Sequence, residues 1–241
     1  SGGTFSGEIT APSLKLSSNI IKASDGGTAI TLDTSDNVIF TNGGKLFSGL
    51  QVFTADATWT KPSGVTAVQV FVTGGGGGGG GSTLTNAPGG GAGGTSIKFI
   101  TTGIGSTESI TVGSAGTVTS NGAGGNGGTS SFGSHCTATG GTGGPNMGFS
   151  GASGGSGASG DINFDGGDGG VRAQGNPDTG GGHGGASYWG GGGRGASYNS
   201  QANGEAGQAF GSGGGGSSAE AVSRSGGLGK SGIVVVYEYK G

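Results

Sequence analysis

The chain has little of what most folded proteins use to hold themselves together. Its 241 residues include one cysteine and five prolines, and only 10% of the residues are charged. The single cysteine, Cys136, excludes an internal disulfide framework. Five prolines and long unbroken glycine runs exclude a collagen triple helix. Ten scattered Lys and Arg residues against thirteen acidic ones leave no basic stripe, so we expect no binding to nucleic acid.

Apolar residues are also scarce. Leu, Ile, Val and Phe together number 41 of 241, about 17%, which is below the level at which a chain normally builds a sizeable apolar core. This argues against a conventional globular enzyme, while a net charge of only −3 argues against disorder. The longest apolar run, Ile233–Tyr237, is far shorter than the roughly 20 residues that cross a bilayer, so we expect no membrane-spanning segment.

Glycine is the abundant residue, and it is unevenly placed. The chain has 69 glycines, about 29% of its length and some four times the ordinary usage. Residues 114–230 contain 42 of these glycines but only nine of the 41 Leu, Ile, Val and Phe residues. The middle of the chain therefore cannot fold around a hydrophobic core.

The first 49 residues predict short strands. Residues 8–11, 13–17, 29–33 and 37–41 alternate apolar with polar residues at period two, and glycine- and asparagine-rich turns separate the later ones. A module of this size with one apolar stripe per strand has too little core to be stable alone. We therefore interpret residues 1–49 as part of an oligomeric fibre shaft, and expect the oligomer to be a homotrimer.

Further strand-like runs flank the glycine-rich region. They lie at about 50–73, 95–113 and 231–239, with a turn expected at residues 58–62. These runs can form one small sheet that gathers both ends of the glycine-rich region and anchors it.

The glycine-rich region itself divides into about ten segments, which are residues 74–81, 89–94, 121–128, 140–144, 151–160, 165–170, 180–185, 190–195, 211–216 and 225–229. An isolated segment of this kind is a flexible linker, because ordering glycine costs the most backbone entropy. Packed side by side as polyproline II-like helices of three residues per turn, the segments can instead bond laterally through their backbones. The expected fold is mostly irregular and β: a shaft segment (1–49), then a glycine-rich domain (50–241) with an anchoring sheet and a bundle of about ten polyglycine II helices (about 74–94 and 114–230) joined by exposed loops.

Several ordered motifs resemble a known family. Residues 53–74, which run from Phe53 through Thr58-Trp-Thr-Lys-Pro62 into the first glycine run, are similar to the opening of the glycine-rich domain at the tips of bacteriophage tail fibres. Residues 110–116, 127–133 and 231–237 match later parts of the same domain. The resemblance covers roughly residues 50–241.

The resemblance implies a polyglycine II sandwich whose exposed loops bind a receptor. It implies an adhesin at the distal end of the tail fibre of a virion, outside the cell, with an outer-membrane protein or a surface glycan of a bacterium as partner. No cofactor and no enzymatic activity are implied. In some relatives the tip is a separate chain, whereas here it looks fused to a shaft segment.

Counting the segments predicts which loops lie far from the shaft. If segment 74–81 runs outward and each later segment reverses direction, the far loops are 82–88, 129–139, 161–164, 186–189 and 217–224, and the near ones are 145–150, 171–179 and 196–210. The candidate receptor-binding residues on these far loops are Leu84, Phe132, His135, Phe164, Tyr188 and Trp189, since exposed aromatics give large contact area at low entropy cost. Each ring could instead merely cover the glycine bundle. A single miscounted segment inverts every later assignment.

Other motifs are weaker. The phosphate-loop-like stretch at Gly226–Ser231 has Arg224 where the motif needs glycine, and a strand follows it in place of a helix. Asp161, Asn163 and Asp165 match the start of a calcium loop, but Arg172 stands at the twelfth position in place of glutamate. His135, Cys136 and His183 form neither a zinc pattern nor a triad.

Two other functions stay open on the sequence alone. A depolymerase acting on surface polysaccharide would need two carboxylates in a cleft, and no spacing among the thirteen acidic residues singles out a pair. An ice-binding or purely structural glycine-rich protein would fit the glycine content, but not the shaft-like strands or the aromatic residues of the loops.

Overall fold

The structure is a computed structural model that describes residues 20–22, 28–32, 38–40, 46–146, 148–172, 180–198 and 200–241. It is mostly β, and the described residues contain no helix. The strands are β1 (Ile20–Lys22), β2 (Thr28–Leu32), β3 (Val38–Phe40), β4 (Leu46–Phe53), β5 (Ala57–Thr60), β6 (Val65–Thr73), β7 (Thr95–Ile100), β8 (Thr107–Thr111), β9 (Ser130–Phe132), β10 (Cys136–Ala138), β11 (Gly157–Ala158), β12 (Ile162–Phe164) and β13 (Ile233–Lys240).

The early strands pair with one another. β1, β2 and β3 form an antiparallel sheet in that order. β2 and β3 coincide with two of the four strands predicted from the sequence, while the predicted strands at 8–11 and 13–17 lie outside the described residues.

Two five-stranded antiparallel sheets replace the single small sheet that the sequence predicted. Their strand orders are β12–β7–β6–β13–β4 and β11–β10–β9–β8–β5. The sheets pack face to face, and valines of β6 and β13 meet Trp59, Ile110 and Phe132 from the second sheet. Most of the buried large apolar side chains of the described residues lie between these two sheets, which form the side-chain core of the domain. The expected turn at 58–62 begins inside β5, and Trp59 is fully buried.

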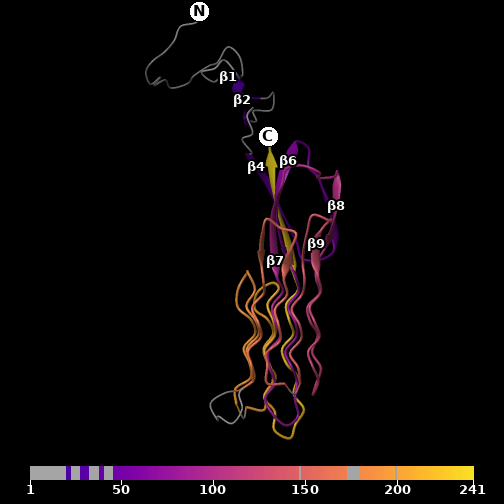
Figure 1. Ribbon diagram of the computed structural model, residues 1–241, viewed down its shortest axis with the longest axis vertical. Helices are drawn as coiled ribbons and strands as arrows, with labels where there is room; N and C mark the ends of the chain where they lie inside the picture. The colour runs from indigo at the N-terminus through magenta and orange to yellow at the C-terminus, as the bar shows by residue number, and fades with distance from the viewer. Residues whose placement is uncertain are drawn as a thin grey trace, which may run out of the picture.

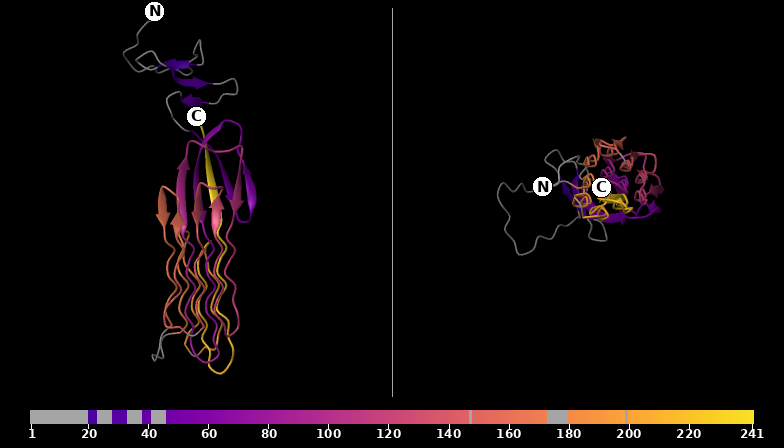
Figure 2. Two further views of the ribbon diagram at one scale, coloured as in Figure 1. Left: turned by 45° about the vertical axis from the view of Figure 1, so that its right-hand side comes forward. Right: turned by 90° about the horizontal axis from the view of Figure 1, so that it is seen from below.

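Extended glycine-rich segments leave one end of the sheets and run side by side (Figures 1 and 2). We call them together the glycine bundle. Within the part of the chain that the structure describes there are twelve such segments, joined laterally by backbone hydrogen bonds: 74–81, 87–94, 113–119, 122–128, 139–145, 151–156, 165–171, 180–186, 190–196, 204–209, 211–217 and 225–231.

The hydrogen bonds of segment 74–81 repeat every three residues. To segment 87–94, the backbone N–H groups donate in the pairs Gly74–Gly94, Gly77–Gly91 and Gly80–Pro88. To segment 122–128, they donate in the pairs Gly75–Gly128, Gly78–Gly125 and Gly81–Gly122. To segment 225–231, they donate in the pairs Gly76–Lys230 and Gly79–Gly227, and all eight distances are 2.8–3.0 Å. Successive residues therefore bond to three different neighbouring segments. The buried backbone groups obtain their partners from other parts of the chain, as burial requires.

Three of the segments lie in the centre of the bundle and nine surround them. Segments 74–81, 87–94 and 211–217 are buried along their whole length. A Cβ atom at any of residues 75–79 would lie 1.9–2.0 Å from a carbonyl oxygen of another segment, so these five positions admit only glycine. In the surrounding segments about every third residue is exposed, and these residues include Asn126, Thr139, Thr142, Ser153, Ser156, Asp168, His183 and Arg194.

The course of the chain corrects the loop assignment made from the sequence. Segments 113–119 and 204–209 were not counted. Because the first of them already carries the chain away from the sheets, the loops at 129–139, 161–164 and 186–189 lie at the sheet end, where β9, β10 and β12 belong to the sheets. Residues 145–146, 148–150, 171–172 and 196–198 lie at the opposite end, while residues 147, 173–179 and 199 of the same predicted loops lie outside the described residues. Loop 82–88 precedes both uncounted segments, and the second of them restores the order for 217–224, so these two loops lie together at the far end as predicted.

Candidate functional site at the far end of the bundle

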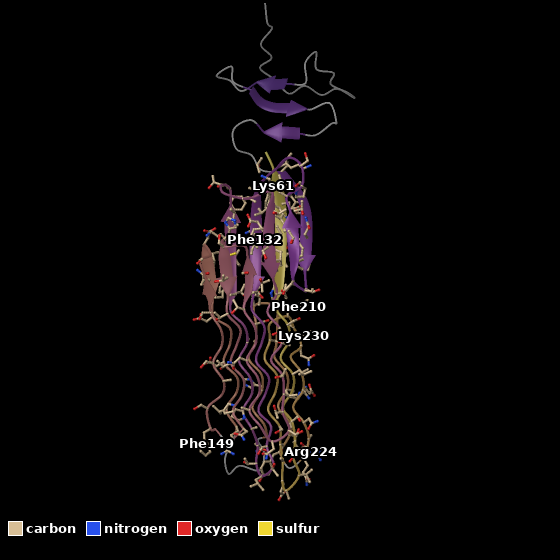
Figure 3. All side chains as sticks on the ribbon, turned by 90° about the vertical axis from the view of Figure 1, so that its right-hand side faces the viewer. Lys61, Phe132, Phe149, Phe210, Arg224 and Lys230 are labelled. Carbon is tan, nitrogen blue, oxygen red and sulfur yellow. The ribbon has the colours of Figure 1, made fainter. Side chains whose placement is uncertain are left out.

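The far end of the bundle, opposite the sheets, gathers the turns between outgoing and returning segments. Figure 3 shows Phe149 and Arg224 at this end and Lys61 at the opposite end of the molecule's sheets. The loops at 82–88 and 217–224 are tied together by isolated bridges that pair Ser82 with Arg224 and Asn86 with Ser218. The hydroxyls of Thr83 and Ser223 are 3.2 Å apart. These contacts give the two central turns a defined arrangement.

A third turn is fixed to them by Arg172. Its Nη1 donates to Oγ1 of Thr85 at 2.7 Å and to the carbonyl oxygen of Asn86 at 3.3 Å. The guanidinium carbon lies 4.4 Å from the ring centroid of Phe149, which is a cation–π contact. Arg172 thus connects three loops that are distant in the sequence, and it holds a half-exposed aromatic ring at the surface.

The far end also carries exposed apolar side chains. Leu84, Phe149, Val171, Tyr198 and Val222 are between 38% and 73% exposed, and each belongs to one of the turns at this end. Most other large apolar side chains with high exposure lie at the sheets, and Leu228 on the side of the bundle is the exception among the described residues. We call these five residues together with Arg172 the far-end cluster. An apolar group beside one fixed cation, on a protein with few apolar residues, is suited to binding a macromolecular surface.

Of the six candidate residues named from the sequence, only Leu84 lies in this place. Phe132 is fully buried between the sheets, where its ring centroid is 5.7 Å from that of Trp59. Nε2 of His135 lies 3.1 Å from Oε1 of Glu108 on the second sheet. Phe164, Tyr188 and Trp189 are exposed, but they lie against the first sheet. The structure does not bring the six residues together.

Sequence reasoning missed the other members of the far-end cluster because their loops were placed at the wrong end. A search for glycines spaced three residues apart would have found the uncounted segments, since Gly113 and Gly116 have this spacing, as do Gly204 and Gly207. Phe149 and Tyr198 would then have been assigned to the far end.

The weaker motifs do not assemble into sites. Oδ2 of Asp161 accepts a hydrogen bond from the backbone N–H of Phe99 at 2.7 Å, and Oδ1 of Asn163 accepts one from Gly160 at 3.1 Å, so both are engaged in the loop. Among the described residues, no group of three or more His, Cys, Asp or Glu residues could hold a metal ion.

Cys136 has no nucleophilic character in this environment. It is fully buried in the core, and burial raises the pKa of its thiol to about 11. A cysteine that acts as a nucleophile needs a lowered pKa and access to substrate. The described part of the chain also has no helix with the length and apolar character needed to cross a membrane.

Comparison with known proteins identifies the domain. A search of curated protein sequences finds no match. A family model described as a glycine-rich domain matches residues 52–239, which include the whole glycine bundle and the two five-stranded sheets except most of β4 and the last residue of β13. The chain therefore belongs to this glycine-rich domain family.

Proposed function

We propose that this chain is the tip adhesin of a bacteriophage tail fibre, and that the far-end cluster binds a receptor on the outer surface of a bacterium. The observation that carries the proposal is the presence of five exposed apolar side chains, Leu84, Phe149, Val171, Tyr198 and Val222, at the end of the molecule opposite the sheets, where Arg172 joins three loops and contacts Phe149. The resemblance of residues 50–241 to the tips of tail fibres gives the biological setting, on the virion and outside the cell.

The bundle suits this role if its segments are polyglycine II helices. Hydrogen bonds that repeat every three residues in segment 74–81 support this, because a helix of that type has three residues per turn and no internal hydrogen bonds. Such a bundle is stabilised by its backbone, so the turns at its end carry little of the folding free energy. Their side chains are free to serve recognition.

The shaft belongs to the same proposal. Residues 1–49 have too little apolar sequence for a core of their own, and a homotrimeric shaft would supply one from three copies. β4 starts within this segment and pairs with β13, so the sheets lie next to the shaft and the bundle extends away from it. The far-end cluster is then the part of the chain that first reaches the cell.

Arg172 and the exposed apolar residues are adapted to binding without cleavage. The described turns at the far end carry one carboxylate, that of Glu220, whereas hydrolysis of a glycosidic bond in the usual way needs two. We therefore expect the partner, whether an outer-membrane protein or a surface glycan, to be held and not cut.

Binding to whole cells tests the proposal. The fluorescently labelled chain is added to a panel of Gram-negative strains, and cells that bind it are treated with protease or with periodate to separate a protein receptor from a glycan. Leu84→Ser and Val222→Ser should each weaken binding, since a central apolar anchor contributes about 2 kcal/mol or more, about thirtyfold in affinity.

Leu228→Ser is the matched control. Leu228 is also about half exposed, but it lies on the side of the bundle, and its loss should leave binding unchanged. Equal losses for Leu84→Ser and Leu228→Ser would place recognition on the side of the bundle and contradict the proposal. Shortened polysaccharide appearing with time would identify a depolymerase instead.

A further inference from the structure

The sheet β12–β7–β6–β13–β4 has one face in the core and another directed away from it, which we call the outer sheet face. Strand register assigns residues to it, because directly paired residues point to the same side. Its side chains are those of Phe47, Leu50, Val52, Ala67, Gln69, Phe71, Thr73, Thr95, Ile97, Phe99, Ile162, Phe164, Ile233, Val235, Tyr237 and Tyr239. None of them is charged.

Aromatic rings form a continuous row across this face. Ring centroids 5.2–6.3 Å apart link Phe99 to Tyr239, Phe47, Tyr237 and Phe71 in turn, and from Phe71 the contacts continue to Tyr188, Trp189 and Phe164. Tyr188 and Trp189 come from the loop between two bundle segments and cover only one end of the sheet. Eight side chains on or beside the face remain between 37% and 61% exposed: Phe47, Leu50, Val52, Phe99, Ile162, Phe164, Tyr188 and Trp189.

Several of the few polar groups on the face are bonded to one another. The hydroxyls of Thr73 and Thr95 are 2.8 Å apart, and Thr73 Oγ1 accepts a hydrogen bond from Nε1 of Trp189 at 2.9 Å. Gln69 Oε1 accepts from the hydroxyl of Tyr239 at 3.4 Å. A sugar bound to aromatic rings needs neighbouring hydrogen-bond partners to fix its hydroxyls, and this face offers few. It is suited to another apolar surface.

The exposed area matches a protein interface. Eight large side chains, each about half exposed and each offering ~200 Å² in full, leave on the order of 700–800 Å² of largely apolar surface. A stable interface buries about 800 Å² on each partner, and the largest patch on a typical monomer is about 300–600 Å². The outer sheet face is thus large enough for a specific contact.

We infer that the outer sheet face is an interface between copies of this chain. β4, the edge strand that carries Phe47, Leu50 and Val52, begins at Leu46, within the segment proposed as an oligomeric shaft. Copies that associate through residues 1–49 bring their β4 strands, and with them the outer sheet faces, close together. This step rests on the proposed shaft, but it is independent of what the far-end cluster binds.

Tryptophan fluorescence of the full chain tests the inference. The chain has two tryptophans. Trp59 is buried in the core and Trp189 lies beside the outer sheet face, so quenching by acrylamide reports mainly on Trp189. In the wild-type protein Trp189 should be protected, and light scattering should give a multiple of the 22.3 kDa chain mass. Leu50→Asp should expose Trp189 to acrylamide and weaken association at least about thirtyfold, because it places a charge in an apolar contact.

Leu84→Asp is the matched control, since it adds the same charge at the far end and should leave both the mass and the quenching unchanged. A monomeric wild-type chain would overturn both the inference and the proposed shaft, while leaving receptor binding to be judged by the cell assay. An oligomer in which acrylamide quenches Trp189 freely would overturn the inference alone, and would restrict association to the shaft. Protection of Trp189 only when oligosaccharide is added would identify the face as a glycan platform.

Discussion

Gly77→Ala tests whether the glycine bundle is held by close backbone contact. Gly77 lies in the middle of a central segment, and its Cβ atom would stand 2.0 Å from the carbonyl oxygen of Thr142. Ordinary contact at a Cβ atom is 3.4–4 Å, so the two segments would have to separate by about 1.4 Å. No side chain can turn aside to make room, because the obstacle is backbone.

The cost follows from the hydrogen bonds that this separation strains. Gly141 and Gly144 of segment 139–145 donate to Gly75 and Gly78 on either side of Gly77, and Gly77 itself donates to Gly91. Three such bonds and the packing around them, at about 0.5–1.5 kcal/mol net each, amount to roughly 2–4 kcal/mol. The reduced entropy of the unfolded chain with alanine returns only about 0.4–1 kcal/mol. We expect a net loss of about 2–3 kcal/mol, which lowers the melting temperature by roughly 4–12 °C in a domain of this size.

Thermal unfolding followed by circular dichroism measures the effect, with Gly191→Ala as the matched control. Gly191 also belongs to a bundle segment, but a Cβ atom there would meet nothing within 4 Å. Its substitution should leave the melting temperature unchanged or raise it slightly. Equal melting temperatures for Gly77→Ala and the wild type would refute close packing of the central segments.

Three further predictions concern other parts of the molecule. Cys136 should resist thiol reagents until the chain unfolds. Burial raises the pKa of its thiol from 9.0 to about 11, so between these values only the unfolded thiol ionises, and the free energy of unfolding should fall as pH rises through that interval. Trp59→Phe should cost about 1.5–3 kcal/mol in chemical denaturation, since Nε1 of Trp59 donates at 2.8 Å to the buried carboxylate of Glu238. In the cell-binding assay Tyr198→Ala should weaken binding more than Trp189→Ala, and the reverse order would move recognition to the sheet end.

Most of the longer strands could be predicted from the sequence. β6, β7, β8 and β13 coincide closely with runs of alternating or continuous apolar residues, and such runs arise because one or both faces of a strand enter a core. The separate β5 was mistaken for a turn, because Thr58-Trp-Thr-Lys-Pro62 combines one large apolar residue with a proline.

The short strands could not be predicted. β9, β10, β11 and β12 have only two or three residues each, which is too few for a period to be visible. Their pairing depends on strands supplied from elsewhere in the chain, as when β10 pairs with both β9 and β11. Phe132 was accordingly interpreted as a residue of an exposed loop, whereas it fills the space beside Trp59 in the core. A single large apolar residue within a polar stretch, such as Phe132, should therefore be considered first as a core residue.

The sequence analysis assigned the loops at 129–139, 161–164 and 186–189 to the wrong end because it identified bundle segments by their glycine content. Glycine content indicates how deeply a segment lies in the bundle, and a surface segment can contain few glycines. A central segment has neighbours on all sides, so nearly every residue must be small, as the unbroken run at 74–81 shows. In the surface segment 113–119 only Gly113 and Gly116 are buried, so Ser114, Thr117 and Val118 can occupy positions between and beyond them. Counting dense glycine runs therefore finds the centre of the bundle and overlooks its surface. Because each overlooked segment reverses the direction of the chain, glycine spacing of three residues, and not glycine density, is the sequence signal that predicts which loops lie at the far end.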